Sequence, residues 1–371
     1  MNRRKAFCLL CALFLIPLSV NAQEKSPVSI LVAQLEDPGP LSTRKAISGL
    51  VALSDKVKAK ILFVQVYRAN LSWFSSKFAD SKPYNSCLEK TQEDPLNLLI
   101  QQAHSKGIKV YAWLNLLSLS DNRNAFILKK YGTDILTRNL KEKKSLDDYK
   151  IDKQFFLEPG DTRVRSELSS ITGEIVSAYS GLDGILFDYI RYPDQDPDYG
   201  YTKINIERFE KATGIKDINK NNPAWNDWKR AQVDELLALL VNKVRKMRPD
   251  MRVGSTGCAP FVRAYYEAYQ DWPSWVNNGL VDFAILMSYP KDVLEFSKNI
   301  REAKDKVKDF NKVYIGLPAY KLVDEDKIFK DELQIARGAG AGSCVIFHYG
   351  SLLEDSGFIN ILESFEKGGL E

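Results

Sequence analysis

LDGILFDYIRYP, residues 182–193, is the stretch of sequence that decides the fold. Its apolar run ends at Asp188, which is followed by an aromatic residue, a cation and a proline. A short apolar run without polar alternation is typical of a strand that helices bury on both faces, as in a parallel sheet. We therefore expect an α/β fold in which Asp188 stands at the C-terminal end of a buried strand.

Seven other runs share this character, and a segment with helical periodicity follows each run. The eight runs are residues 29–35, 60–67, 109–115, 184–188, 252–256, 282–287, 312–317 and 343–348. Helix starts are marked by Ser42 or Thr43 and by Asp94-Pro95, and a long helix extends from about Pro223 to Arg248. Eight strand–helix units predict a (β/α)8 TIM barrel, with an open doubly wound sheet as the structural alternative.

The domain organisation is predicted to be simple. The chain has 371 residues, of which 44% are hydrophobic and 27% charged, which is typical of a globular protein. No repeat or linker divides residues 23–371, so we expect one barrel domain. The polar segments 116–157 and 189–222, after the third and fourth runs, are predicted to be long loops on the upper face, over a groove.

Residues 1–22 resemble a secretory signal peptide. Three basic residues at positions 3–5 precede an apolar run, and small residues stand at positions 20 and 22. We expect cleavage near Ala22 and export to the periplasm or the medium. The apolar run is shorter than the roughly 20 residues that span a bilayer, so no stable membrane anchor is predicted.

The net charge, the cysteines and the histidines limit the classes of partner and cofactor that we expect. Loss of the three basic residues in segment 1–22 would lower the net charge from +4 to +1, which favours neither nucleic acid nor an anionic membrane as a partner. Cys87, Cys258 and Cys344 would remain and are predicted to be buried thiols. With only two histidines, His104 and His348, and no clustered ligand spacing, we expect no metal and no cofactor. The sequence makes no prediction of oligomeric state.

The active site of a barrel enzyme lies at the C-terminal ends of its strands. The side chains there are mostly aromatic or hydrogen-bonding, and the sequence contains no phosphate-binding glycine loop. Sugars suit such a site, because their ring faces stack on aromatic side chains while their hydroxyls bond to polar groups. These strand ends carry Gln34, Glu36, Asp37, Tyr67, Arg68, Trp113, Asn115, Asp188, Tyr189, Arg191, Tyr192, Ser255, Thr256, Ser288, Tyr289, Tyr320, His348 and Tyr349.

Asp188 is the main catalytic candidate, as an acid, a nucleophile or an acceptor for sugar hydroxyls. Its alternative role is an ion pair with Arg191 that orders the loop. A glycosidase ordinarily needs a second carboxylate, and Glu158 and Asp271 are the candidates. Each has a structural alternative at a helix N-terminus. Glu36 and Asp37 are reserves.

Ten residues are candidates for binding the substrate. The aromatic ones could instead fill the core, Arg191 could pair with Asp188, and His348 could be a hydrogen-bonded structural residue. The ten are Tyr67, Trp113, Asn115, Arg191, Tyr192, Trp272, Tyr289, Tyr320, His348 and Tyr349.

An ordered set of motifs resembles the bacterial glycosyl-hydrolase-like family 10, a group of exported barrel proteins. The motifs are VYAWLN, FLEPGDTRVRSEL, LDGILFDYIRYP, WNDWKRAQVDELL, DWPSWVNNGLVDFAILMSYP, IGLPAY and CVIFHYGSL. The resemblance implies a (β/α)8 barrel that cleaves glycan chains of the bacterial envelope. It matches Asp188 to the family's strand-4 aspartate, and Asn115, Arg191, Tyr192 and Tyr289 to positions that line the family's cleft.

Chitinase-like barrels have a similar fourth-strand motif, with a catalytic Glu two residues after its last Asp. This chain has Ile190 at that position, so that mechanism is not expected. The leading hypothesis is a glycoside hydrolase acting on bacterial envelope or extracellular polysaccharide, with peptidoglycan glycan strands favoured. The alternative is a non-catalytic glycan-binding barrel, and a lyase of phosphorylated metabolites is a weaker third.

Overall fold

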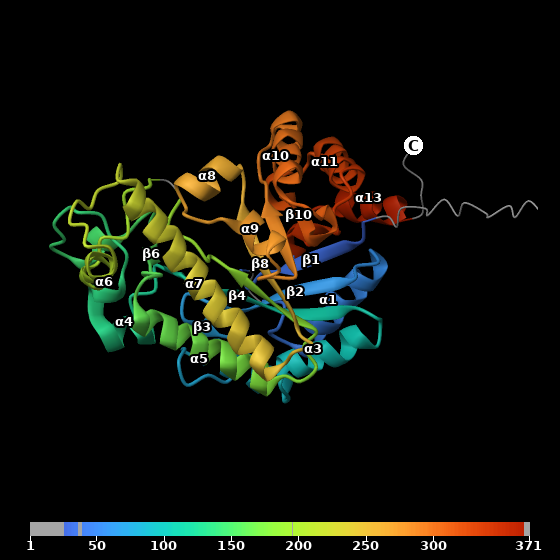
Figure 1. The fold of residues 1–371 in the computed structure, drawn as a ribbon. Helices are drawn as coiled ribbons and strands as arrows, with labels where there is room; N and C mark the ends of the chain where they lie inside the picture. Colours follow the sequence, from blue (N-terminus) through green and yellow to red (C-terminus); the bar gives the residue numbers. More distant parts are fainter. Residues whose placement is uncertain (1–25, 36–38, 195, 367–371) are drawn as a thin grey trace, which may run out of the picture.

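The computed structural model describes residues 26–35, 39–194 and 196–366, and its centre is a closed barrel of parallel strands (Figure 1). Each strand pairs with the next, and the first strand pairs with both the second and the last, which closes the barrel. In barrel order the strands are β1 Val28–Val32, β2 Ile61–Arg68, β4 Lys109–Asn115, β7 Gly184–Asp188, β8 Arg252–Cys258, β9 Phe283–Met287, β10 Val313–Leu317 and β11 Ser343–Phe347. The predicted (β/α)8 barrel is confirmed.

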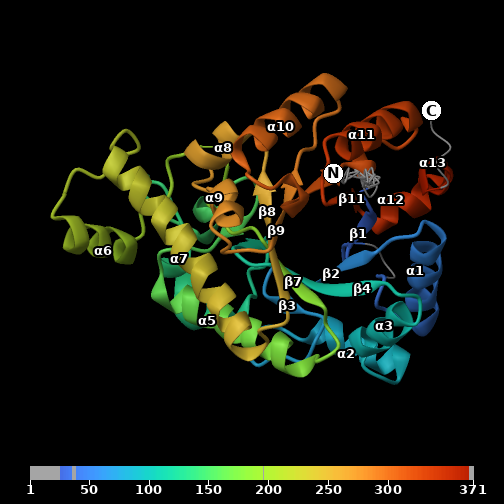
Figure 2. The same cartoon turned by 45° about the vertical axis from the view of Figure 1, so that its right-hand side comes forward.

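Helices surround the barrel, as Figure 2 shows from a second direction. Those that follow the strands include α1 Arg44–Lys56, α3 Pro95–His104, α5 Thr162–Ala178, α7 Pro223–Met247, α10 Val293–Lys306, α11 Asp326–Gly338 and α13 Ser356–Glu366. Shorter ones are α2 Lys82–Thr91, α4 Phe126–Tyr131, α6 Lys203–Thr213, α8 Phe261–Tyr266, α9 Trp272–Asn277 and α12 Tyr349–Glu354. The signal-like segment 1–22 lies outside the described residues, as do Glu36 and Asp37.

The helix starts follow from capping side chains. Thr43 accepts a hydrogen bond from the Ala46 amide at the start of α1, and Asp94 does the same for Asn97 at the start of α3. Asn222 caps α7, one residue before the predicted start, and Pro223 occupies the first turn, where its missing N–H costs nothing. The predicted boundaries of these helices are therefore accurate to within a residue or two.

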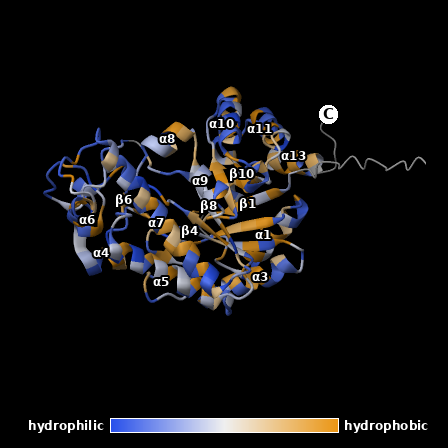
Figure 3. Cartoon of the chain, in the orientation of Figure 1, coloured by the Kyte–Doolittle hydropathy of each residue, from blue (hydrophilic) through white to orange (hydrophobic). Residues whose placement is uncertain are grey.

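Two hydrophobic layers hold the barrel together, and Figure 3 shows the strands as its most apolar part. The outer layer packs strands against helices and contains most of the buried apolar residues. The inner layer fills the barrel with Leu31, Ala33, Ile61, Phe63, Tyr111, Trp113, Leu186, Phe283, Ile285, Tyr314 and Val345. Burial on both faces explains why the strand sequences are continuously apolar.

Two glycines make room for the large rings of the inner layer. A Cβ atom on Gly184 would lie 2.4 Å from the Tyr111 ring, and one on Gly254 would lie 2.2 Å from the Phe283 ring. Such distances are far below van der Waals contact, so a side chain at either position would displace an aromatic ring. The glycine in LDGILFD therefore serves the packing of the barrel interior.

The loops after β4 and β7 carry structure of their own on the upper face. The first contains β5 Ser118–Ser120 and β6 Phe155–Phe156, paired as a small antiparallel ribbon, together with α4. The second contains α6, which packs on the N-terminal part of α7 through Phe209 and Trp225. These segments form the part of the molecule that extends beyond the barrel in Figure 1.

The described residues also bear on thiols and membrane spans. Cys87 and Cys344 are buried and Cys258 is half-buried. Over the described ranges, every helix is too short or too polar to cross a bilayer. The same residues contain no group of three or more His, Cys, Asp or Glu side chains arranged to hold a metal ion.

Candidate active site

A cleft of about 730 Å³ opens at the C-terminal ends of the barrel strands. Every strand contributes a side chain to it at or just past its end, as a barrel active site requires. The contributions are Ala33 and Leu35 after β1, Gln65 and Arg68 of β2, Trp113 and Asn115 of β4, Asp188 of β7, Thr256 and Cys258 of β8, Met287 and Tyr289 at β9, Tyr320 and Lys321 after β10, and Phe347 of β11.

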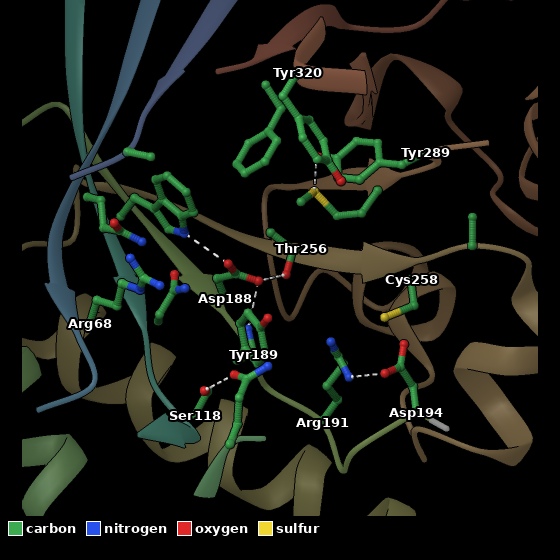
Figure 4. Close-up of a pocket in the computed structure, with 18 of the residues that line it drawn as sticks. Arg68, Ser118, Asp188, Tyr189, Arg191, Asp194, Thr256, Cys258, Tyr289 and Tyr320 are labelled. Carbon is green, nitrogen blue, oxygen red and sulfur yellow. Dashed lines mark hydrogen bonds and ion pairs between the residues drawn. The ribbon is translucent and has the colours of Figure 1, made fainter. Parts of the chain in front are cut away.

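Asp188 lies inside this cleft, as Figure 4 shows. Its Oδ1 accepts a 2.5 Å hydrogen bond from the Thr256 hydroxyl and a 2.7 Å bond from the Tyr189 amide. Its Oδ2 accepts a 3.1 Å bond from the Trp113 indole N–H. Trp113 is on β4 and Thr256 is on β8, the two neighbours of β7, so the barrel itself orients the carboxylate. Apart from the indole, Oδ2 has no partner among the described residues, and it can still face a ligand.

The backbone after Asp188 adopts a conformation that is uncommon for a residue with a side chain. Tyr189 has a φ of 57°, in the left-handed region. This turn ends the strand and allows the Tyr189 amide to bond back to the Asp188 carboxylate. Left-handed residues other than glycine cost free energy and are found more often at functional sites.

Burial raises the pKa of Asp188 above its ordinary value of 3.8. The hydrogen bonds from Thr256, the Tyr189 amide and Trp113 oppose this rise, because they stabilise the charged carboxylate. The positive charge of Arg191 also lowers the pKa of Asp188. A carboxyl with a raised pKa, held by donors in a cavity, is suited to proton transfer or to charge stabilisation.

An aromatic wall faces Asp188 across the cleft. Tyr289 stacks on Phe347 with ring centroids 5.6 Å apart, and Tyr320 meets Phe347 edge to face at 5.3 Å. The Trp113 ring also meets Phe347 edge to face, at 6.1 Å. Flat apolar faces beside a polar carboxylate are the combination with which proteins bind sugar rings.

Arg191 lines the cleft but pairs with an acid that sequence reasoning did not select. Its guanidinium lies 2.9 Å from Asp194, and Arg263 also pairs with Asp194. The ion pair of Arg191 with Asp188, which was the alternative role for Asp188, is not formed, and Arg191 acts on Asp188 only through its charge. The only hint of this ion pair in the sequence is that Arg191 and Asp194 are three residues apart.

The loop after β4 adds a second set of residues that were not selected in advance. Ser118 and Gln154 bond to each other at 2.7 Å at the edge of the cleft, and Ser120, Asp121 and Lys153 also line it. The sequence predicted a long polar loop over the groove here, without showing which of its residues face inward. The pairing of β5 with β6 brings Ser118, Ser120 and Gln154 to the edge of the cleft.

Glu158, one of the two candidates for the second carboxylate, does not line the cleft. It is fully buried, and its Oε1 accepts hydrogen bonds from the Tyr192 hydroxyl and the Gly160 amide. Tyr192 is buried with it, so neither side chain faces the groove. The β5–β6 ribbon ends at Phe156, and Leu157, the residue before Glu158, pairs with Leu136.

Asp271 and Trp272 also lie outside the cleft lining. Asp271 stands at the N-cap position of α9 and accepts a 2.7 Å hydrogen bond from the Ser274 hydroxyl. Trp272 is fully buried, because Gly257 of β8 leaves a space that its indole fills. A Cβ atom on Gly257 would lie 2.6 Å from that ring.

A β-bulge explains the position of Tyr67. The pairing of β2 with β4 shifts register between Gln65 and Tyr67, which breaks the alternation of side chains. Tyr67 consequently packs in the outer layer, where its hydroxyl accepts a bond from Asn70, while Arg68 faces the cleft.

The residues at the end of β11 also differ in whether they face the cleft. Phe347 lines the cleft, whereas His348 and Tyr349 do not. His348 is the N-cap of α12, and its Nδ1 accepts a 3.1 Å bond from the Gly350 amide. Of the predicted substrate-binding residues, the structure brings together around Asp188 the side chains of Trp113, Asn115, Arg191, Tyr289 and Tyr320. The catalytic and binding roles of all these residues stay predictions.

Curated proteins with similar sequences are named as glycosyl hydrolases. The chain is 24% identical to glycosyl hydrolase DigH of Escherichia coli K12 over 258 residues, which cover 64% of this chain and 56% of that protein. It is 21% identical to glycosyl hydrolase YngK of Bacillus subtilis 168 over 298 residues, 72% of this chain and 55% of that protein. The chain thus spans about half the length of the curated relatives it matches.

Solved structures with a similar fold include a β-amylase and a β-galactosidase. The catalytic domain of β-amylase from Paenibacillus polymyxa matches with a TM-score of 0.58 at 12% identity, over 91% of this chain and 98% of that one. The β-galactosidase from Marinomonas ef1 matches with a TM-score of 0.61 at 11% identity, over 87% of this chain and 54% of that one. At this identity the likeness shows the fold alone. Residues 32–332 match the family described as Glycosyl hydrolase-like 10, and the chain belongs to that family.

Proposed function

We propose that this protein is a glycoside hydrolase that cleaves polysaccharide of the bacterial envelope, with peptidoglycan glycan strands as the leading substrate. The observation that carries the proposal is Asp188, held by Trp113 and Thr256 inside a cleft with an aromatic wall. Membership of a glycosyl-hydrolase-like family supports the reaction class. The signal-like segment 1–22 supports export, which would bring the enzyme to such a substrate.

In this proposal a sugar ring lies against Tyr289 and Tyr320, and the scissile bond lies above Asp188. Asp188 acts through Oδ2, the oxygen whose only partner among the described residues is the indole of Trp113. Two carboxylates normally share glycoside hydrolysis. The cleft offers Asp121, Asp194 and Glu295 as the partner, and Glu295 lines it from the first turn of α10. We favour Glu295, because Lys150 pairs with Asp121 and two arginines pair with Asp194.

The test is the release of new reducing ends from purified peptidoglycan glycan strands. We expect the wild type to release them and Asp188→Asn to lose this activity. Asp271→Asn is the matched control, because it removes a carboxylate that lies outside the cleft. Full activity in a folded Asp188→Asn protein would contradict the proposal.

A non-catalytic glycan-binding protein is the second candidate. The positions of Glu158 and Asp271 favour it, since neither candidate for the second carboxylate lines the cleft. This candidate predicts no turnover on a broad panel of glycans, together with oligosaccharide binding that weakens when Tyr289 or Tyr320 is replaced by Ala. Turnover that depends on Asp188 would exclude it.

A further inference from the structure

The charged side chains of the cleft are unequally paired. Asp194 pairs with both Arg191 and Arg263, Asp121 lies 2.8 Å from Lys150, and Lys321 donates a 2.8 Å bond to the Tyr289 carbonyl. The cations that line the cleft are Arg68, Lys153, Arg191, Arg263 and Lys321, against the carboxylates Asp121, Asp188, Asp194 and Glu295. A ligand in this cleft therefore meets a small positive excess.

Arg68 is one of the cleft-lining cations that have no ion pair among the described residues. The bulge in β2 turns its side chain into the cleft, and Figure 4 shows it extending toward the side that holds Asp188. Across the described ranges, its guanidinium makes no hydrogen bond or ion pair with the protein. The side chain is half-buried, so part of its hydration is lost without compensation from the protein. A guanidinium in this position points to an anionic group on the ligand.

An independent observation at the next strand also points to a ligand. Asn115 is only 8% exposed and lines the cleft, yet its Oδ1 has no hydrogen-bond partner in the described part of the chain. Buried polar atoms are almost always bonded, so this acceptor is free for a hydroxyl or amide N–H of a bound molecule. Asn115 is paired in register with Asp188, and Arg68 ends the strand on the other side of β4. The three side chains thus end three consecutive strands.

We propose that Arg68 is a specificity-determining residue that binds a carboxylate carried by a sugar of the substrate, while Asn115 accepts a hydrogen bond from the same sugar. This inference rests on the proposed function of the cleft as a glycan site. One guanidinium matches a planar carboxylate with two parallel hydrogen bonds. The four carboxylates of the cleft disfavour a doubly charged phosphate, whereas the small positive excess suits a single negative charge.

The test compares each acidic glycan with a neutral form of the same glycan. One pair is peptide-free peptidoglycan strands, with their lactyl carboxylates either free or converted to methylamides. The other pair is hyaluronan oligosaccharides and their carboxyl-reduced form. We expect the wild type to bind the carboxylate member of one pair at least about 10-fold more tightly, as a charge-assisted hydrogen bond implies. The pair that shows the preference identifies the source of the carboxylate.

Variants then assign the preference to Arg68. In Arg68→Gln the ratio of the two affinities should fall to near 1, and in Arg68→Lys it should take an intermediate value, since the charge stays but the planar fork is lost. Arg301→Gln is the matched control, because it removes the same charge from an exposed residue of α10, and it should keep the wild-type ratio.

Two results would overturn the inference: a ratio that is unchanged in folded Arg68→Gln, and the lack of any carboxylate preference in both pairs, including a lack of binding. Preferential binding that depends on Arg68 without any hydrolysis would instead contradict only the proposed hydrolase activity.

Discussion

One buried carboxylate, Asp188, lines the cleft, and another, Glu158, lies outside the cleft lining. The two are alike in most respects. Asp188 and Glu158 are both buried, and burial raises the pKa of each above its ordinary value. Each accepts hydrogen bonds from a backbone amide and from side chains. They differ in what lies beyond the carboxylate: an open cavity for Asp188 and the Tyr192 hydroxyl for Glu158.

This difference shows that burial and a raised pKa do not identify a catalytic group by themselves. Asp188 is positioned by Trp113 and Thr256, which come from the strands on either side of β7. Glu158 is positioned by loop residues that pack over the barrel, and it completes a buried network with Tyr192. We infer that Asp188 serves a bound ligand and that Glu158 stabilises the loops that pack around it.

The largest expected effect is the loss of activity in Asp188→Asn. The amide cannot take part in proton transfer or act as a nucleophile, so kcat/KM should fall by about 10²–10⁴-fold or more. Initial rates of reducing-end release measure the change. The melting temperature should stay close to that of the wild type, because the shape of the side chain is retained.

Removal of the Glu158 carboxylate should lower the stability of the protein instead of its activity. Glu158→Ala leaves the Tyr192 hydroxyl without its partner and opens a cavity, so we expect a loss of about 2–3 kcal/mol in the free energy of unfolding. Urea denaturation measures this loss. Activity per folded molecule should stay within about twofold of the wild type. A roughly 100-fold fall would show instead that Glu158 contributes to catalysis.

Glu332 on α11 is a third buried carboxylate, and it does not line the cleft. Its side chain is fully buried, both oxygens lack hydrogen bonds within the described residues, and burial raises its pKa to about 8. The native state therefore holds this proton more tightly than the unfolded chain does. The associated stability is fully present below the ordinary pKa of 4.5 and is lost as pH rises through about 8.

Glu332→Gln should consequently stabilise the protein by about 2 kcal/mol at pH 8.5 and have little effect at pH 4. Melting temperatures of both proteins across this pH range provide the measurement. Equal slopes of stability against pH in the two proteins would show that Glu332 is not the group responsible.

The smallest expected effect concerns the pH profile of the cleft. The Thr256 hydroxyl lowers the pKa of Asp188, so Thr256→Val should raise it further. The limb of the kcat/KM profile that reports Asp188 should then move to higher pH. Ser274→Ala, which removes a hydroxyl bound to Asp271 outside the cleft, should leave the profile in place. A limb that does not move in Thr256→Val would mean that another group controls it.

Much of the fold could be predicted from the sequence, because strands buried on both faces and capped helices leave strong local patterns. The placement of Asp188 at a strand end followed from the same pattern. Tyr67 could not be placed, since the bulge in β2 that turns it outward has no local signature. Trp272 fills a space left by Gly257, and this packing joins two segments that no local pattern connects. Glu158 follows an apolar run that resembles a strand end but pairs in a small ribbon instead.

The measurement that tests the central claim most directly is a crystal structure of the Asp188→Asn protein with a bound glycan fragment. We predict a sugar in the cleft, stacked against Tyr289 or Tyr320, with a hydroxyl or amide N–H donating to Asn115 Oδ1 and the glycosidic oxygen beside residue 188. A fragment bound elsewhere on the barrel, with this cleft empty under saturating conditions, would contradict the account.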